Sequence, residues 1–179
     1  SPLSGGGALA KQGEGDLTYT GAASYEAATI VAGGKLKLPS GASIYSPLGE
    51  LNVGYHGIGQ CEITGASITT GRVNLGYSGV YGSGTLLFQG GTLTTKSILR
   101  WTLDSQIAFD GGTLSPLEQD SSLLVGFTSG SAELLQGGLV IDTKGFNANA
   151  TAEFTGVGRL TKAGQGVLSL SSNNTHTGG

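Results

Sequence analysis

The side chains that could carry acid and base chemistry are few and lie far apart along the chain. Asp104 and Asp110 would share one face of an unbroken strand, but extended backbone at about 3.3 Å per residue places them about 20 Å apart. Paired catalytic carboxylates lie within about 10 Å of each other. Asp110 also occupies a repeat position that is held elsewhere by Thr64, Gln89 and Gln136, so no column of carboxylates is predicted for calcium or for acid and base catalysis.

Nucleophilic catalysis and metal binding are not indicated either. The two histidines, His56 and His176, accompany no G-x-S-x-G motif that would place a serine nucleophile. Cys61 is the single cysteine, so it cannot form an intrachain disulfide or a cysteine cluster for zinc. It alternates with Ile63 on one face, which predicts a buried, inert thiol. We therefore expect no enzyme activity, no catalytic residue, no metal site and no cofactor.

Aromatic side chains give one hypothesis for a ligand site. Tyr55 and Tyr77 occupy equivalent repeat positions, and Tyr81 follows soon after them. Tyr55, Tyr77 and Tyr81 would form a speculative binding stripe if sugar rings stack on them. The simpler interpretation is a ladder that stabilises the fold, because like residues stack in register in parallel coils for structural reasons alone.

The composition excludes several classes of protein. The chain is 37% hydrophobic, so it has a core to bury, although glycine supplies 34 of its 179 residues. Charged residues make up 12%, and the nine Lys and Arg form no cluster, so neither nucleic acid nor an anionic membrane is an expected partner. The sequence contains no apolar run of about eighteen residues, so insertion into a membrane is not expected. With no Met and no leader, the numbering is expected to begin inside a larger polypeptide.

Short alternating strands closed by glycines recur through the middle of the chain. The pattern is F-Q-G-G-T-L at 88–93, F-D-G-G-T-L at 109–114 and L-Q-G-G-L-V at 135–140, with a weaker copy at 63–68. A sister pattern, L-N-V-G-Y at 51–55, returns as V-N-L-G-Y at 73–77. The copies are offset by 21 to 26 residues, and no stretch has helical periodicity.

A period of this length, built from short strands and tight corners, predicts an all-β fold. We expect a right-handed parallel β-helix, a β-solenoid of about eight coils of roughly 20 to 25 residues, over residues 1–179 as one segment. Leucine-rich repeats and propeller blades do not fit, because their signatures are missing. The residues expected to point inward are Leu51, Val53, Cys61, Ile63, Val73, Leu75, Leu86, Phe88, Leu93, Ile107, Phe109, Leu114, Leu135, Leu139 and Ile141.

A longer motif occurs twice, near the two ends of the chain. The pattern G-x-G-x-L-x-K-x-G-x-G-x-L spans Gly5 to Leu17 and again Gly156 to Leu168, and all seven defined positions match. This motif, and the segment 156–179 as a whole, resembles the passenger-associated β-strand repeat of bacterial autotransporters. His176 stands where that repeat usually has Tyr, and Ser172 stands for a Gly. The second copy stops at Gly179, so we expect the parent protein to continue.

The resemblance implies a passenger folded as a right-handed β-helix and exported across the outer membrane of a Gram-negative cell, to be displayed on the surface or secreted. It favours a non-catalytic stalk or adhesin segment of an autotransporter-type protein. The alternative is a carbohydrate-binding or carbohydrate-active β-helix, similar to a lyase or hydrolase. Expected partners are the flanking coils of the parent chain, host or bacterial surface glycans, or a second copy through exposed backbone edges.

Overall fold

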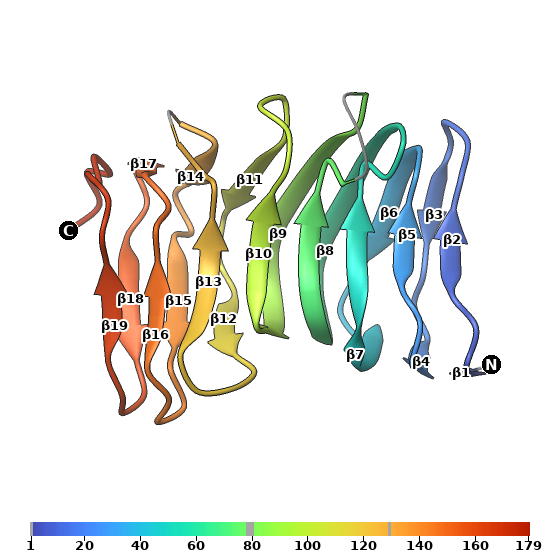
Figure 1. Cartoon of the computed structure of the whole chain (residues 1–179), viewed down its shortest axis with the longest axis horizontal. Helices are drawn as coiled ribbons and strands as arrows, with labels where there is room; N and C mark the ends of the chain where they lie inside the picture. Colours follow the sequence, from blue (N-terminus) through green and yellow to red (C-terminus); the bar gives the residue numbers. More distant parts are fainter. Residues whose placement is uncertain (1, 78–80, 129) are drawn as a thin grey trace.

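The computed structural model describes residues 2–77, 81–128 and 130–179, and over these ranges the chain is all β. These described ranges hold no helix, and hence none that could cross a membrane. Strands and corners alternate along the chain (Figure 1). The strands are β1 (Leu3–Gly5), β2 (Leu9–Lys11), β3 (Asp16–Thr18), β4 (Ala22–Tyr25), β5 (Thr29–Val31), β6 (Gly34–Leu38), β7 (Ser43–Val53), β8 (Ile58–Leu75), β9 (Ser83–Thr95), β10 (Ser97–Arg100), β11 (Gln106–Phe109), β12 (Thr113–Pro116), β13 (Ser121–Val125), β14 (Ala132–Leu134), β15 (Leu139–Asp142), β16 (Ala148–Ala150), β17 (Phe154–Gly156), β18 (Leu160–Ala163) and β19 (Leu168–Leu170).

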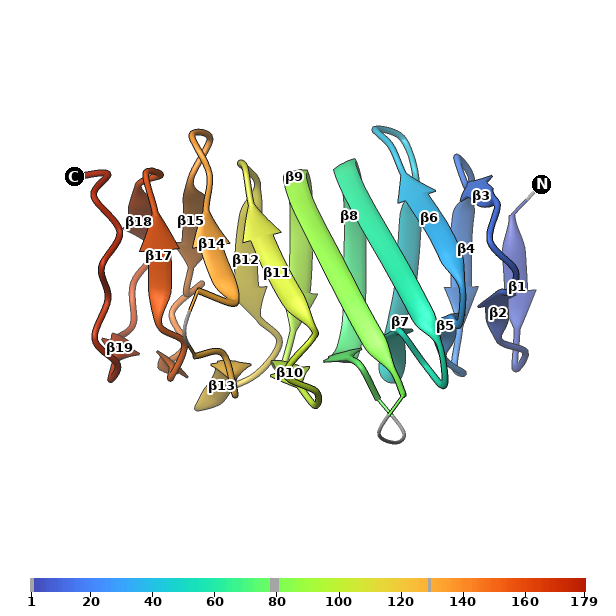
Figure 2. The same cartoon turned by 90° about the horizontal axis from the view of Figure 1, so that it is seen from above.

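Each coil crosses three faces of a parallel solenoid. The first face contains β1, β4, β12, β15 and β18, the second contains β2, β5, β10, β13, β16 and β19, and the third contains β3, β6, β11, β14 and β17. The long strands β7, β8 and β9 bend through corners and serve two or three faces each. The second face lies toward the viewer in Figure 1, and the third is seen from above in Figure 2.

The winding agrees with the sequence-based expectation. All pairings between the described strands are parallel, and each strand pairs with the strand one coil before or after it. In Figure 1 the chain rises along the second face, crosses to the back and advances from the N-terminal to the C-terminal end. This path makes the solenoid right-handed. It completes about seven turns, close to the eight expected.

Apolar columns fill the solenoid interior. Leu36, Cys61, Leu86 and Ile107 follow one another in register on the third face, and all four are buried. Beside them Phe88 and Phe109 meet edge to face with ring centroids 6.3 Å apart. Burying such side chains contributes about 1.5–3 kcal/mol each. The buried hydrophobic side chains extend from Ala23 to Phe154, and the strands at the two ends are more exposed.

One predicted inward residue is wrong. Leu135 is partly exposed, whereas its neighbour Leu134 is completely buried and pairs with Phe109. The Q-G-G motif at 136–138 suggested that Leu135 was equivalent to Phe109, but the corner after β14 is longer than the one after β11, and Ile141 is the partner of Leu114. A register error of one residue moves a side chain to the opposite face of a strand. The other residues predicted to point inward are buried.

Glycines close the corners between the third and first faces. Gly91 has φ of 83°, a conformation that side chains rarely adopt. A Cβ atom there would lie 2.1 Å from the carbonyl oxygen of Ala66 in the preceding coil. The corner therefore needs glycine both for its backbone angle and for the close approach between coils.

The register at β14 can be tested with two neighbouring leucines. Leu134→Ala should lower the free energy of unfolding by about 2–5 kcal/mol, because it empties a buried site. Leu135→Ala should lower it by less than about 1 kcal/mol, because that side chain is already partly in water. Urea denaturation followed by circular dichroism measures both values. Equal effects, or the reverse order, would contradict the register.

Candidate ligand surface and the repeat motif

Three aromatic side chains line up where the chain leaves the second face. The ring centroids of Tyr55 and Tyr77 are 5.9 Å apart with planes tilted by 34°, and those of Tyr77 and Trp101 are 5.2 Å apart, edge to face. Tyr55 and Tyr77 each follow a glycine that comes directly after the strand, whereas Trp101 follows Arg100, the last residue of β10. We call Tyr55, Tyr77 and Trp101 the aromatic strip.

The predicted tyrosine stripe is therefore only partly brought together. Tyr55 and Tyr77 are neighbours, as their equivalent repeat positions indicate. Tyr81 is 86% exposed, and among the described residues no ring contact joins it to the strip. Sequence reasoning missed Trp101 as the third member, because its strand position corresponds to Gly76 rather than to Tyr77. The sequence offered one signal for it: Trp101 follows Tyr77 by an offset in the low twenties, as Tyr77 follows Tyr55.

Asparagines behind the strip hold the indole in place. The Nδ2 of Asn74 donates to the Oδ1 of Asn52 over 2.7 Å, and the indole Nε1 of Trp101 donates to the Oδ1 of Asn74 over 3.0 Å. Both asparagines are almost fully buried. Buried amides are costly unless they are hydrogen-bonded, so this short ladder fixes the ring orientation.

A small hollow lies beside the indole. Leu99, Arg100, Trp101 and Val125 line a volume of about 150 Å³ on β10, β13 and the turn after β10. The Nε of Arg100 donates to the carbonyl oxygen of Ser105 over 2.8 Å, and its terminal nitrogens donate to the carbonyls of Leu103 and Gly126. We call this space the Trp101 hollow.

The acidic residues considered for catalysis have structural surroundings. The Oδ1 of Asp110 accepts a hydrogen bond from the backbone N–H of Gly137, 2.7 Å away in the next coil. Asp104 is exposed, and its backbone carbonyl accepts a hydrogen bond from Ser83. No group of three His, Cys, Asp or Glu side chains that could hold a metal ion occurs in the described ranges.

The histidines and the cysteine also lie apart. His56 has φ of 57° and packs its ring against Tyr55 with centroids 4.5 Å apart, whereas His176 meets Phe154 in the last coil. Cys61 is completely buried, as predicted. Burial, with a smaller contribution from the charge of Glu62, raises the pKa of its thiol to about 12, so the sulfur stays protonated at neutral pH.

The lysine of the long motif caps the corner that follows it. The ammonium of Lys11 donates to the carbonyl oxygens of Gln12, Gly13 and Gly33 over 2.7, 2.6 and 3.0 Å, and Gly33 belongs to the next coil. Lys162 donates to the carbonyl of Gly164 over 2.8 Å and reaches the hydroxyl of Thr143 in the preceding coil at 3.4 Å. Each lysine thus joins its own corner to a neighbouring coil.

The two copies of this motif occupy different faces. Lys11 ends β2 on the second face, whereas Lys162 lies in β18 on the first face. The motif therefore encodes a strand, a corner and the next strand, and this unit fits more than one corner of the solenoid. Likeness in sequence between the two copies does not make them equivalent in position.

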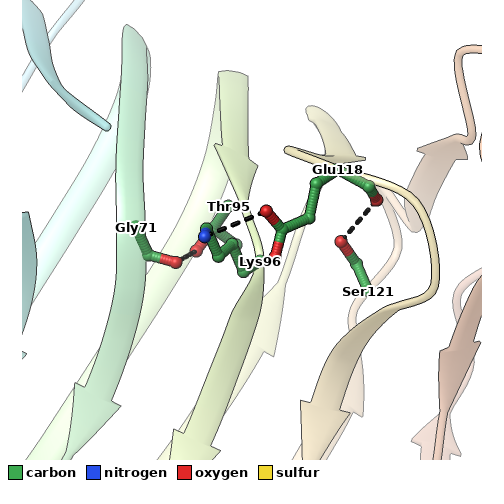
Figure 3. A network of polar contacts seen from close by, with 5 residues as sticks. All are labelled: Gly71, Thr95, Lys96, Glu118 and Ser121. Atoms are coloured by element: carbon green, nitrogen blue, oxygen red, sulfur yellow. Dashed lines mark hydrogen bonds and ion pairs between the residues drawn. The ribbon is translucent and has the colours of Figure 1, made fainter. Parts of the chain in front are cut away.

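Other corners are held by hydroxyl groups and ion pairs. The buried hydroxyl of Thr95 donates to the carbonyl of Gly71 over 3.2 Å, and the ammonium of Lys96 lies 2.9 Å from a carboxylate oxygen of Glu118 in the next coil (Figure 3). The hydroxyl of Ser121 donates to the carbonyl of Glu118 over 2.7 Å (Figure 3). The carbonyl of Gly71 also accepts a hydrogen bond from the backbone N–H of Lys96, so Thr95 adds a second donor at this bend.

The coils stack in register, side chains cap the corners, and the lysine motif recurs on different faces. These features define a β-solenoid repeat protein. Residues 9–38 and 160–179 match the family described as passenger-associated-transport-repeat. The chain therefore carries two segments that are similar to the passenger repeats of autotransporters. Each matched segment contains the part of one copy of the lysine motif that runs from its first leucine onward.

A curated relative is similar to most of this chain. The chain is 27% identical over 234 aligned residues to the adhesin BmaC autotransporter of Brucella suis biovar 1 (strain 1330). The alignment covers 97% of this chain but only 7% of that relative, so the chain corresponds to a small part of its length. No solved structure matches the chain.

The lysine cap can be tested by removing its charge. Lys11→Met should destabilise the first coils by about 2 kcal/mol, because it removes charge-assisted hydrogen bonds and leaves their carbonyls without a donor. The measurement is amide hydrogen exchange over residues 9–38, where the variant should exchange faster than the wild type. Lys144→Met, at an exposed lysine, serves as the control and should leave exchange in that region unchanged. Unchanged exchange in Lys11→Met would refute the capping role.

Proposed function

We propose that this chain is a non-catalytic stalk and adhesin segment of a surface-displayed or secreted autotransporter-type protein. The observation that carries the proposal is the continuous ladder of parallel strands on three faces, which joins each coil to the next. A rod in which every coil contacts only its neighbours suits a spacer that can gain or lose coils without a new fold. The flanking coils of the parent protein are then its first partners.

The surroundings of the polar residues support a non-catalytic role. Asp110, the acid placed at a repeat corner, caps a backbone N–H of the next coil rather than facing a cleft. Cys61 is buried and protonated. The name of the Brucella relative describes an adhesin, which favours attachment over turnover for this segment as well.

A carbohydrate-binding β-helix is the second candidate. The aromatic strip favours it, because Trp101 is 55% exposed and its ring is held in a fixed orientation. This candidate is compatible with an adhesive stalk, since binding needs no catalytic group. A carbohydrate-active enzyme would additionally need an acid and a base close together on one surface.

Removal of one coil tests the stalk assignment. Deletion of residues 67–91 joins Ala66 to Thr92, which is the register partner of Ser67. The shortened chain should fold cooperatively and still be displayed when fused to an autotransporter barrel, because the strands on all three faces meet new partners in register. Circular dichroism and surface labelling measure the outcome. Failure of this variant to fold would contradict a modular stalk.

Deletion of residues 67–78 is the matched control. It removes only part of a coil and brings a strand of the third face into the place of a first-face strand, so folding or display should fail. The non-catalytic part of the proposal is tested by incubating the purified chain with polysaccharides. Release of sugars or unsaturated products that Asp110→Asn abolishes would contradict it.

A further inference from the structure

The aromatic strip and the Trp101 hollow form a surface feature that the stalk role does not use. Trp101 keeps 55% of its surface exposed although it lies beside Tyr77 and above a hydrogen-bonded asparagine. A side chain that only stabilised the coils would gain most by being covered. Its exposed indole instead borders the hollow that Leu99 and Val125 line.

We infer that the Trp101 hollow is a binding subsite for a pyranose ring of a cell-surface glycan, and that Tyr77 and Tyr55 extend it along the solenoid axis. The inference rests on the proposed adhesive function and names its ligand class. The apolar C–H face of a pyranose stacks on aromatic rings, while its hydroxyls need hydrogen-bonding groups at the rim. The lining beside Trp101 is mostly apolar, and Arg100 is the one charged residue among the four that form it.

The size of the hollow favours a sugar unit over a protein partner. Its volume is about 150 Å³ and four residues line it. A stable protein interface uses about 20–30 residues on each side. A single sugar ring with its neighbours along the strip needs far less surface, and it can gain affinity from several weak contacts.

Pre-organisation makes the subsite effective. The hydrogen bond from the indole Nε1 to Asn74 and the edge contact with Tyr77 fix the ring before a ligand arrives. Arg100 is fixed by its hydrogen bonds to three backbone carbonyls. Groups that are already ordered lose little conformational entropy on binding, so even a small contact area is favourable.

Arg100 supplies polar recognition at the rim. A guanidinium has five N–H donors, and the three carbonyls accept one from each nitrogen. One N–H on each terminal nitrogen is therefore left to donate to a hydroxyl or a carboxylate of the sugar. The subsite accordingly suits neutral sugars, and it suits acidic sugars whose carboxylate can reach the guanidinium.

The arrangement of the strip indicates how a longer glycan would lie. The ring centroids follow one another at 5.2 and 5.9 Å from Trp101 through Tyr77 to Tyr55. The coil spacing thus sets a regular succession of aromatic side chains, and successive sugars would run parallel to the solenoid axis. An oligosaccharide should bind more tightly than its monosaccharide, because it contacts more than one ring.

Intrinsic fluorescence provides the test, because Trp101 is the only tryptophan of the chain. The wild-type chain is first screened on an array of host-type and bacterial-type glycans, both neutral and acidic. The best-bound oligosaccharide is then titrated while the tryptophan emission is followed. We expect a saturable change in emission, and at least a tenfold weaker affinity in Trp101→Ala when binding is measured by calorimetry.

Two further variants make the result specific. Tyr81→Ala removes an exposed aromatic outside the strip and should leave the affinity unchanged. Trp101→Phe keeps a stacking ring but loses the N–H donor, so it should weaken binding less than Trp101→Ala. Binding with no change in emission, equal affinity of Trp101→Ala and wild type, or no glycan bound at millimolar concentration would overturn the inference.

Attachment of the displayed chain to host cells separates this inference from the proposed function. If the wild type and Trp101→Ala attach equally, the glycan subsite is wrong and the adhesive role stands. If neither chain attaches to cells, but the wild type binds glycan on the array more tightly than Trp101→Ala does, the subsite stands and the adhesive role is wrong. Circular dichroism of each variant confirms that the comparison is between folded chains.

Discussion

The hydrogen bonds between successive coils are the constraint on which the rest of the structure depends. A strand of three to five residues cannot satisfy its backbone N–H and C=O groups alone, so each strand must lie in register with the strand one coil away. Once that register is set, like side chains stack on like positions. The core columns of Leu36, Cys61 and Leu86, the asparagine ladder and the aromatic strip are all consequences of the same repeat distance.

The corners carry the second constraint. Where the chain bends, the carbonyls lose their strand partners, and buried carbonyls without donors are costly. Glycine allows the bend, as at Gly91, and a neighbouring donor then restores the hydrogen bonds. That donor is the motif lysine at Lys11, whereas the hydroxyl of Thr95 adds a second hydrogen bond to a carbonyl that already accepts from the backbone N–H of Lys96. The geometry of a capped corner thus explains the K-x-G spacing of the repeat. It also explains why the motif can occur on more than one face of the solenoid.

Alternation and repeat period were sufficient to predict the all-β solenoid, its interior columns and the burial of Cys61. They failed where corner length varies: the corner after β14 is longer than the Q-G-G motif indicated, so Leu135 was assigned to the interior in place of Leu134. Trp101 was missed for a similar reason, because its ring reaches the strip from a different strand position than the tyrosines. Whether a side chain contacts the next coil depends on the three-dimensional path of the backbone, which the spacing of residues along the chain does not give.

In-register hydrogen bonds between coils on all three faces are tested most directly by amide hydrogen exchange of the purified chain. Exchange should be slowest in β7, β8 and β9, on every face they cross, with protection decreasing toward both ends of the solenoid, where a coil has fewer neighbours. Protection confined to one face, or rapid exchange throughout β8 and β9, would contradict the stacked solenoid.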